Sequence, residues 1–305
     1  MGISPVRFQM RRDSFATLHP AVTMLFFILV TVTTALVLHP VITGISLVTA
    51  CAYAVFLKGR KAFVFCLAFV LPLILIVALL NPLFNHAGVT PLFYLKNGNA
   101  VTLEAIVYGI NSACMFAALV LWFFCLSTCM TSDKYVYLFG RIVPTLSLLF
   151  SMVLRFVPRL FSRIREVSNA QRSLAPELKK SPLSALRHGV SVISSTVSWA
   201  LESAVNSSDS MKSRGYGLPG RTSYAIYRFD GRDAALSIIL GACFILSAAA
   251  MALKRIRFRF YPSVLFAGTD AFSIAAYAAF LIFCAAPLIL NIKEDIEWRS
   301  LRSRI

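Results

Sequence analysis

Long apolar segments alternate with short polar connections over most of the 305-residue chain. A membrane-spanning helix needs about 20 mostly apolar residues, because each residue advances about 1.5 Å along a helix that crosses about 30 Å of hydrocarbon. Six segments meet or approach this length: residues 19–38, 41–57, 62–80, 103–128, 234–252 and 271–290. The pattern therefore predicts an all-α integral membrane protein with about six transmembrane helices.

A segment of 105 residues, 129–233, separates the fourth and fifth predicted spans and follows a different pattern. Connections of that length are usually functional. Within it, residues 144–174 and 184–213 place apolar side chains at helical spacing, and the second of these stretches carries an apolar stripe of Val190, Ile193, Val197, Leu201 and Ala204. We therefore predict three parts: an N-terminal transmembrane bundle over 1–128, a cytoplasmic domain of long amphipathic helices over 129–233, and a C-terminal transmembrane part over 234–305.

Composition agrees with a membrane protein and changes the interpretation of the charge. The chain is 58% hydrophobic and only 14% charged, yet its formal net charge is +17. A soluble domain carries roughly 25% charged residues, so an ordinary water-soluble fold is excluded. Proteins that bind nucleic acid are basic but also polar, and we expect no nucleic-acid partner here. In a multi-span protein, Lys and Arg instead gather in the cytoplasmic loops.

The basic residues predict the orientation in the membrane. With both termini in the cytoplasm, 25 of the 30 Lys and Arg residues lie inside and five outside, and the segment 129–233 alone holds 15. The other inside groups are Arg7, Arg11 and Arg12, Lys58, Arg60 and Lys61, and the C-terminal tail. The exception is the basic stretch Lys254–Arg259. Either it is an amphipathic interfacial segment that alternates cations with Ile or Phe, or one of the last two spans is misassigned.

The first long amphipathic stretch carries a row of arginines. Arg155, Arg159 and Arg163 recur every four residues, while apolar residues mark the other side: Leu149, Met152, Phe156, Leu160, Ile164 and Val167. Like charges at this spacing destabilise an isolated helix, so the row needs an anionic partner. Glu166 can serve only Arg163. Phospholipid headgroups and an acidic protein partner both fit, alone or together.

Both long stretches end with an arginine between small or polar residues. The two ends are Gln171, Arg172, Ser173 and Ser213, Arg214, Gly215. Pro176 stops the first helix, and a glycine in the left-handed conformation can cap the second. A single arginine at a helix C-terminus is usually only a cap that interacts with the helix dipole. Two in one segment indicate a shared role, and crossing helices would allow both ends to be presented together.

At these residues the sequence resembles the transmembrane T component (EcfT, CbiQ-like) of energy-coupling factor transporters. The segments LRFVPRLFSRIREVSNAQRS (154–173) and MKSRGYGLPGRT (211–222) resemble the two family signatures. In those signatures an RF-x-P helix, here with Pro158, leads to a first x-Arg-x motif, and a second helix ends in Ala-Arg-Gly. The sequence departs from the family pattern at Gln171 and Ser213, where alanine is frequent, and at Ser173, where glycine is frequent.

The resemblance implies a non-catalytic scaffold in an ATP-driven importer of a vitamin or metal ion. Two cytoplasmic ABC-type ATPase subunits would bind the ends at Arg172 and Arg214, and a coupling helix bearing Arg155, Pro158, Arg159 and Arg163 would support them. A separate membrane-embedded subunit, the S component, would bind the substrate. The ATPases would hold ATP and Mg²⁺, and this chain would bind no cofactor or metal. The location implied is the cytoplasmic (inner) membrane of a bacterium or archaeon.

Motifs of reaction chemistry are absent from the sequence, which has no G-x-x-x-x-G-K-[ST], H-E-x-x-H or G-x-S-x-G and only four scattered histidines. No ionisable residue stands clearly in the middle of a predicted span, so a proton-coupled transporter lacks its usual signature. Two alternatives stay open. The first is an ordinary ABC permease, whose ATPase contact is a single short helix. The second is a lipid-binding integral membrane protein or enzyme.

Overall fold

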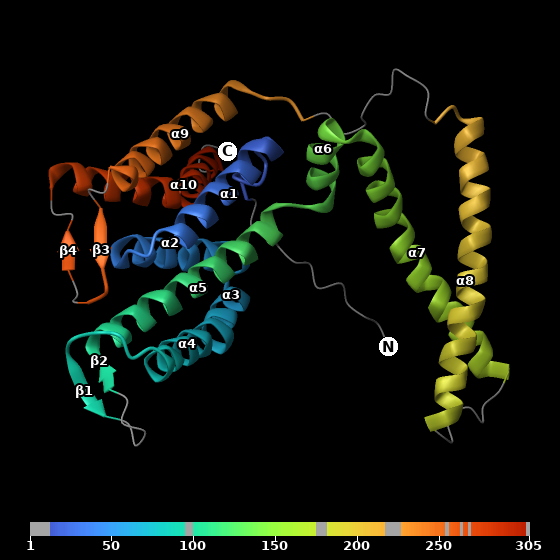
Figure 1. Ribbon diagram of the computed structural model, residues 1–305. Helices are drawn as coiled ribbons and strands as arrows, with labels where there is room; N and C mark the ends of the chain where they lie inside the picture. The colour runs from blue at the N-terminus through green and yellow to red at the C-terminus, as the bar shows by residue number, and fades with distance from the viewer. Residues whose placement is uncertain are drawn as a thin grey trace. The chain divides into compact units, whose positions relative to one another are not determined.

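The structure is a computed structural model that describes residues 13–94, 100–174, 182–216, 227–253, 256–262, 265–267 and 270–302 (Figure 1). The chain divides into two compact units, which we name the membrane unit (Met1–Thr131 with Tyr227–Ile305) and the coupling unit (Ser132–Ile226). The predicted middle part, 129–233, extends beyond the coupling unit by three residues at its start and seven at its end. Several residues used above lie outside the described ones: Arg7, Arg11, Arg12, Pro176, Lys254 and Arg255.

Helices make up nearly all of the described secondary structure, which confirms the all-α prediction. The membrane unit contains α1 (Pro20–Leu36), α2 (Pro40–Lys58), α3 (Arg60–Phe65), the π-helical turn η1 (Cys66–Val70), α4 (Leu71–Phe84), α5 (Leu103–Cys129), α9 (Gly231–Ala252) and α10 (Ala271–Arg302). Its two antiparallel hairpins are β1 (Pro91–Tyr94) with β2 (Ala100–Thr102), and β3 (Arg257–Arg259) with β4 (Leu265–Ala267). The coupling unit contains α6 (Ser132–Ile142), α7 (Pro144–Leu174) and α8 (Pro182–Ser213).

Five helical stretches are long and apolar enough to cross a membrane: Pro40–Lys58, Arg60–Phe84, Leu103–Cys129, Gly231–Ala252 and Ala271–Trp298. Each contains or overlaps a predicted span, and α1, with 17 residues, is a shorter apolar helix at the sixth. The chain is therefore a multi-pass membrane protein. The predicted span 271–290 covers only part of its helix, because α10 continues to Arg302. Its extension is polar, with Lys293 and Glu297 paired at 3.9 Å, and gave no hydropathy signal.

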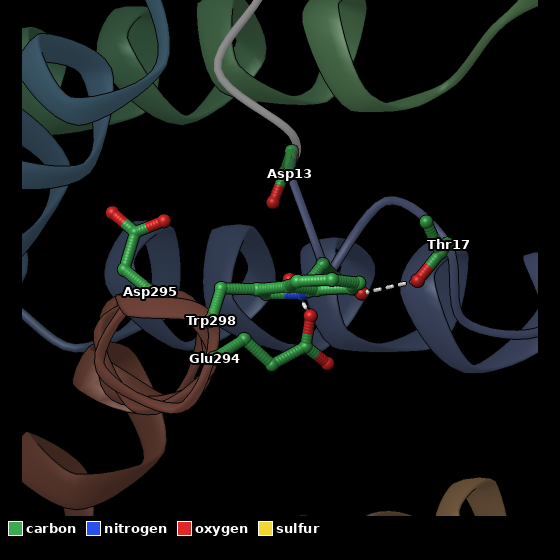
Figure 2. A pocket seen from close by; sticks show the side chains of 6 residues that line it. Asp13, Thr17, Glu294, Asp295 and Trp298 are labelled. Atoms are coloured by element: carbon green, nitrogen blue, oxygen red, sulfur yellow. Dashed lines mark hydrogen bonds between the residues drawn. The ribbon is translucent and has the colours of Figure 1, made fainter. Parts of the chain in front are cut away.

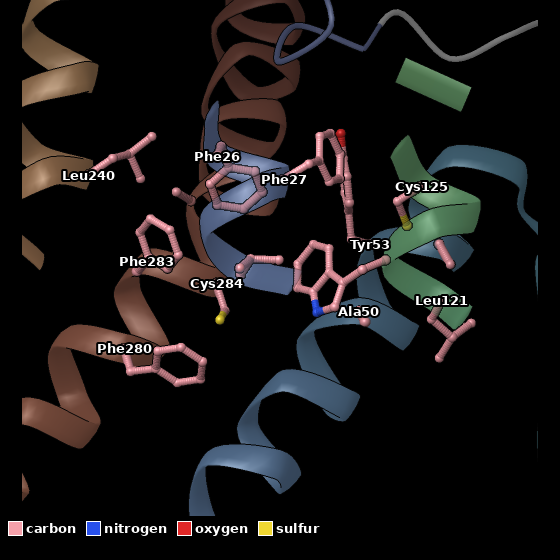
Figure 3. Close-up of a cluster of buried hydrophobic side chains, with 14 of the residues drawn as sticks. Phe26, Phe27, Ala50, Tyr53, Leu121, Cys125, Leu240, Phe280, Phe283 and Cys284 are labelled. Atoms are coloured by element: carbon pink, nitrogen blue, oxygen red, sulfur yellow. The ribbon is translucent and has the colours of Figure 1, made fainter. Parts of the chain in front are cut away.

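Aromatic side chains from α1, α2, α5 and α10 form the core of the membrane unit (Figure 3). Phe26 lies 5.9 Å from Trp122 and 5.2 Å from Phe283 between ring centroids, and all three are fully buried or nearly so. The Trp122 indole N–H donates to the Ser46 hydroxyl at 2.9 Å, and Ser46 shares a second hydrogen bond of 2.8 Å with Thr34. These two bonds pair the buried polar groups of Trp122, Ser46 and Thr34, as a membrane interior requires.

The basic stretch Lys254–Arg259 leads into the β3–β4 hairpin. Ile256 and Phe260 are buried, Phe258 is half-buried against Phe260 with ring centroids 4.5 Å apart, and Arg259 is exposed. Cations and apolar residues therefore alternate with the two-residue period of a strand. Because α9 and α10 are both candidate spans, the structure supports an amphipathic connection over a misassigned helix.

Connections between the apolar helices meet at one end of the membrane unit. The Asn85 side-chain amide, after α4, donates to the Tyr261 hydroxyl, after β3, at 2.8 Å. His39, between α1 and α2, lies 5.7 Å from Phe258 between ring centroids. The Nδ1 of His39 accepts the N–H of Val41, so its Nε2 carries the proton and donates to the Tyr277 hydroxyl at 3.1 Å. The first, third and fifth connections between the apolar helices (α1–α2, α4–α5 and α9–α10) thus lie at one end of the membrane unit. This is what a chain that crosses the membrane six times requires.

Ser46→Ala tests whether the buried hydroxyl holds this core together. The change leaves the Trp122 N–H without a partner in an apolar environment, so we expect the free energy of unfolding to fall by about 1 kcal/mol. Thermal or denaturant unfolding of the detergent-solubilised chain measures it. The control is Ser127→Ala, which removes an exposed hydroxyl bonded only within α5 to the Phe124 carbonyl. Equal stability of the two variants would contradict the role of Ser46.

Candidate functional site

The two long helices of the coupling unit, α7 and α8, run antiparallel and cross (Figure 1). Three contacts join them, given with the α7 residue first: Phe156 to Trp199 with ring centroids 6.0 Å apart, Ser168 Oγ to His188 Nε2 at 3.3 Å, and Gln171 Nε2 to Ser191 Oγ at 3.1 Å. From Phe156 to the other two contacts, residue numbers rise along α7 while they fall along α8. The C-terminal end of α7 therefore lies beside the N-terminal part of α8, and the C-terminal end of α8 lies at the opposite end of the pair.

Arg172 and Arg214, which we call the tip arginines, lie at opposite ends of this pair. Arg172 follows Gln171, which contacts Ser191, and Arg214 lies 23 residues beyond Ser191 along the chain. At a rise of 1.5 Å per residue, this places the two tips roughly 35 Å apart. The expectation that both ends would be presented together is wrong, because antiparallel packing separates the two C-termini.

The end of α8 is a Schellman cap built on Gly215, which confirms the predicted glycine cap. Gly215 has a φ of 73°, its N–H donates to the Lys212 carbonyl at 3.0 Å, and the Tyr216 N–H donates to the Met211 carbonyl at 3.1 Å. These two bonds satisfy carbonyls that the helix itself leaves open. Arg214 sits at the cap position and is exposed, as is Ser213 before it.

Arg172 lies in the last turn of α7, two residues before its end at Leu174, and is exposed. Its neighbours are both held: the Gln171 side chain donates to α8, and the Ser173 hydroxyl donates to the Asn169 carbonyl at 3.0 Å. Within the described part of the chain, neither tip arginine has an acidic partner. Each helix end thus fixes the backbone of its arginine and leaves the guanidinium accessible.

The arginine row on α7 does not share one environment. The guanidinium carbons of Arg159 and Arg163 each lie 5.5 Å from the ring centroid of Trp199 on α8, and Arg163 also pairs with Glu166 at 3.1 Å. Arg155 is exposed. Arg159 and Arg163 thus each have a cation–π contact with an aromatic ring of the same unit, and an external anionic partner of the row stays a prediction. Trp199 was not singled out from the sequence. It could have been noticed as the single large aromatic residue of the second amphipathic stretch, residues 184–213.

Pro158 lies inside α7 and is exposed. It lacks the N–H that would bond the Leu154 carbonyl, so one helical hydrogen bond is lost there. Its own carbonyl accepts the Ser162 hydroxyl at 3.2 Å. Upstream, α6 and α7 approach closely: the Ser147 hydroxyl donates to the Val136 carbonyl at 2.9 Å, which fixes the start of α7.

Apolar stripes on both long helices are exposed in the chain alone. On α8 the contact with α7 uses Val192 and Thr196, 5% and 3% exposed, whereas the predicted stripe lies on another face and is half exposed or more: Val190, Ile193, Val197 and Leu201. On α7 an apolar row other than the predicted one is 39–58% exposed: Phe150, Val153, Val157 and Phe161. Contiguous apolar surface of this kind marks an interaction site.

A polar network ties the N-terminal segment of the membrane unit to its helices. The Asp13 carboxylate accepts hydrogen bonds from Tyr53 Oη at 3.1 Å, Cys129 Sγ at 3.2 Å and Asn291 Nδ2 at 2.8 Å. Nearby, Glu294 accepts from Ser14 and pairs with Arg232. A cavity of about 320 Å³ beside the network is lined by Asp13, Ser14, Thr17, Glu294, Asp295 and Trp298 (Figure 2). Since Cys129 ends α5 and Arg232 begins α9, the network holds both chain segments that lead to the coupling unit.

Two comparisons bear on this arrangement. The family model CbiQ, described as cobalt transport protein, matches residues 12–224, which include both tip arginines. The chain is also 32% identical over 124 residues to the energy-coupling factor transporter transmembrane protein EcfT of Lactobacillus helveticus (strain DPC 4571). That alignment covers 40% of this chain and 43% of the relative, so less than half of the relative is matched.

Gly215→Ala and Gly189→Ala form a matched pair that tests the cap. Alanine at Gly215 must adopt a positive φ, which costs about 1–2 kcal/mol and frays the last turn of α8. Gly189 lies inside α8 with nothing within 4 Å of an added Cβ, so alanine there stabilises the helix by roughly 0.5–1 kcal/mol. Hydrogen exchange of the amides at 210–216 should quicken for Gly215→Ala only. Similar exchange in both variants would show that the cap does not hold Arg214.

Proposed function

Because the chain belongs to the CbiQ family of cobalt transport proteins, we propose that it is the non-catalytic transmembrane scaffold of an ATP-driven importer of the energy-coupling factor type. In this proposal two cytoplasmic ABC-type ATPase subunits bind the coupling unit. A separate membrane-embedded subunit, the S component, binds the substrate, which is a vitamin or a metal ion. ATP and Mg²⁺ belong to the ATPases, and this chain carries force between the subunits.

The observation that carries the proposal is the placement of the tip arginines. Both are exposed at the C-terminal ends of helices that pack against each other, roughly 35 Å apart. That separation is about the diameter of a small domain, so the two arginines fit two grooves on two ATPase subunits and not one groove. A guanidinium keeps its charge at all relevant pH values and offers a planar fork to carboxylates, which suits acidic groups in each groove.

The exposed apolar stripes of α7 and α8 support a contact with the S component. A membrane-embedded subunit has apolar surface to cover them, and the stripes lie on the same two helices as the tip arginines. When ATP draws the two ATPases together, the tips move with them and the helices change their tilt. The subunit resting on the stripes then tilts as a rigid body.

The same proposal places the coupling unit and both termini in the cytoplasm, in the cytoplasmic membrane of a bacterium or archaeon. Lys58, Arg60 and Lys61 at the α2–α3 connection agree with this orientation, because cytoplasmic loops are enriched in Lys and Arg. The hairpins β1–β2 and β3–β4 then face outward.

Arg172→Glu and Arg214→Glu test the role of the tip arginines. Each reversal places a carboxylate against the acidic groups of one ATPase, which costs about 2–5 kcal/mol, or at least roughly 30-fold in affinity. We expect each variant to insert normally in the membrane but to retain less ATPase on co-purification, and the double variant to lose ATP-driven uptake. Assembly is measured on purified complexes and uptake in proteoliposomes.

Arg165→Glu is the matched control, since Arg165 is an exposed arginine on α7 that lies about two helical turns, roughly 10 Å, before Arg172. It should assemble and transport as the unaltered chain does. Normal uptake by the double variant would overturn the assignment of the tip arginines. If Arg165→Glu lost as much assembly and uptake as the tip variants do, the effect of the tip variants would come from the change of charge in general. That result would favour the lipid-binding alternative.

Cysteine labelling tests the orientation. In a chain whose seven native cysteines are replaced by alanine, we expect a membrane-impermeant thiol reagent to label Val89→Cys in intact cells and Arg60→Cys only after lysis. Val89 is 66% exposed between α4 and β1, and Arg60 is exposed at the start of α3. The reverse labelling would show the opposite topology. The coupling unit would then lie outside the cell, where it could not bind cytoplasmic ATPases.

A further inference from the structure

Trp199 is the one Phe, Tyr or Trp residue of α8, and three side chains of α7 meet around it. Its ring stacks on Phe156 with an interplanar angle of 12°, and the guanidinium carbons of Arg159 and Arg163 each lie 5.5 Å from its centroid. We call Phe156, Arg159, Arg163 and Trp199 the aromatic clamp. Arg159 and Arg163 are one helical turn apart on α7, so one indole is held by three residues of the facing helix.

Two single hydrogen bonds also join α7 and α8, between Ser168 and His188 and between Gln171 and Ser191, and Val192 and Thr196 are buried beside the clamp. Single hydrogen bonds between flexible side chains constrain the crossing angle only weakly. A stacked indole with two guanidinium groups has a defined geometry and resists a change in that angle.

The clamp lies between the two tips, so a change in the crossing angle at the clamp displaces both of them. Arg163 lies nine residues before Arg172, and Trp199 lies 15 residues before Arg214. The clamp is therefore roughly 13 Å from one tip and about 22 Å from the other. A change of about 10° in the crossing angle would displace Arg214 by about 4 Å, more than the reach of a hydrogen bond.

We propose that Trp199 is the pivot of the coupling unit: a positioning residue whose clamp sets the crossing angle of α7 and α8 and so the separation of the two tip arginines. Arg159 and Arg163 act on the indole and not on an ATPase or on lipid headgroups. The geometric part of this inference concerns the chain alone, and its effect on transport rests on the proposed function.

The separation of the tips is measured by electron–electron double resonance on the full chain in nanodiscs. Spin labels are attached at Ser173→Cys and Ser213→Cys, both exposed, after the seven native cysteines are replaced by alanine. We expect a narrow distribution near 35 Å, about the value given by the helix rise. Trp199→Leu should broaden it roughly twofold, whereas Trp199→Phe, which keeps a ring to stack, should restore it. The control in the same turn of α8 is Ser198→Ala.

Arginine-to-lysine pairs separate stacking from charge. Arg159→Lys with Arg163→Lys keeps both charges but loses the planar groups that stack on the indole, so the distribution should broaden. Arg155→Lys with Arg165→Lys alters two exposed arginines of the same helix and should leave it narrow. A narrow distribution in both pairs would show that the planar groups of Arg159 and Arg163 do not set the geometry of the helix pair and would overturn the clamp.

Transport in the assembled complex then tests the consequence. We expect Trp199→Leu to keep its ATPases but to import several-fold less substrate per ATP hydrolysed, and Trp199→Phe to restore that ratio. An unchanged distance distribution in Trp199→Leu would overturn the inference whatever the tip variants do. If Trp199→Leu broadened the distance distribution but kept normal uptake per ATP, Trp199 would stabilise the helix pair without a positioning role in transport. If Arg172→Glu and Arg214→Glu did not affect uptake, the proposed function would be contradicted. The distance measurements on the chain alone would still hold.

Discussion

The antiparallel contact between α7 and α8 decides what the coupling unit can do. It places the C-terminal ends of the two helices roughly 35 Å apart, and each end carries an exposed arginine on a backbone that is held in place. Parallel packing of the same helices would bring both arginines to one place. In the proposed scaffold, contact with two ATPase subunits would therefore depend on packing between two helices and not on the arginines alone.

The membrane unit holds the two chain segments that continue into the coupling unit. Aromatic rings and a shared serine hydroxyl hold α1, α2, α5 and α10 together, and the Asp13 network links the last residue of α5 with α2 and α10. Glu294 joins the start of α9 to α10. Both chain segments that lead to the coupling unit are thus attached to the helices that pack most closely, which suits a subunit that transmits displacement between partners.

Hydropathy and helix-end chemistry were enough to predict the spans and the arginine-tipped helices, because both signals are local. A run of apolar residues identifies α5 whatever surrounds it, and Gly215 needs only its own φ to end α8. Packing is not local. Which face of α8 meets α7 could not be predicted, since the stripe with the strongest apolar pattern is exposed and Val192 and Thr196 are buried instead. The strand at Arg257–Arg259 and the polar end of α10 were missed for the same reason: neighbours define them.

The central claim is that the two tip arginines engage two different ATPase subunits. Photo-cross-linking from unnatural amino acids at Ser173 and Ser213 in the assembled transporter measures it directly. The account predicts that each position alone yields one chain joined to one ATPase, and that both together yield one chain joined to two. Cross-links from both positions to a single ATPase subunit, or no ATPase cross-link at all, would contradict it.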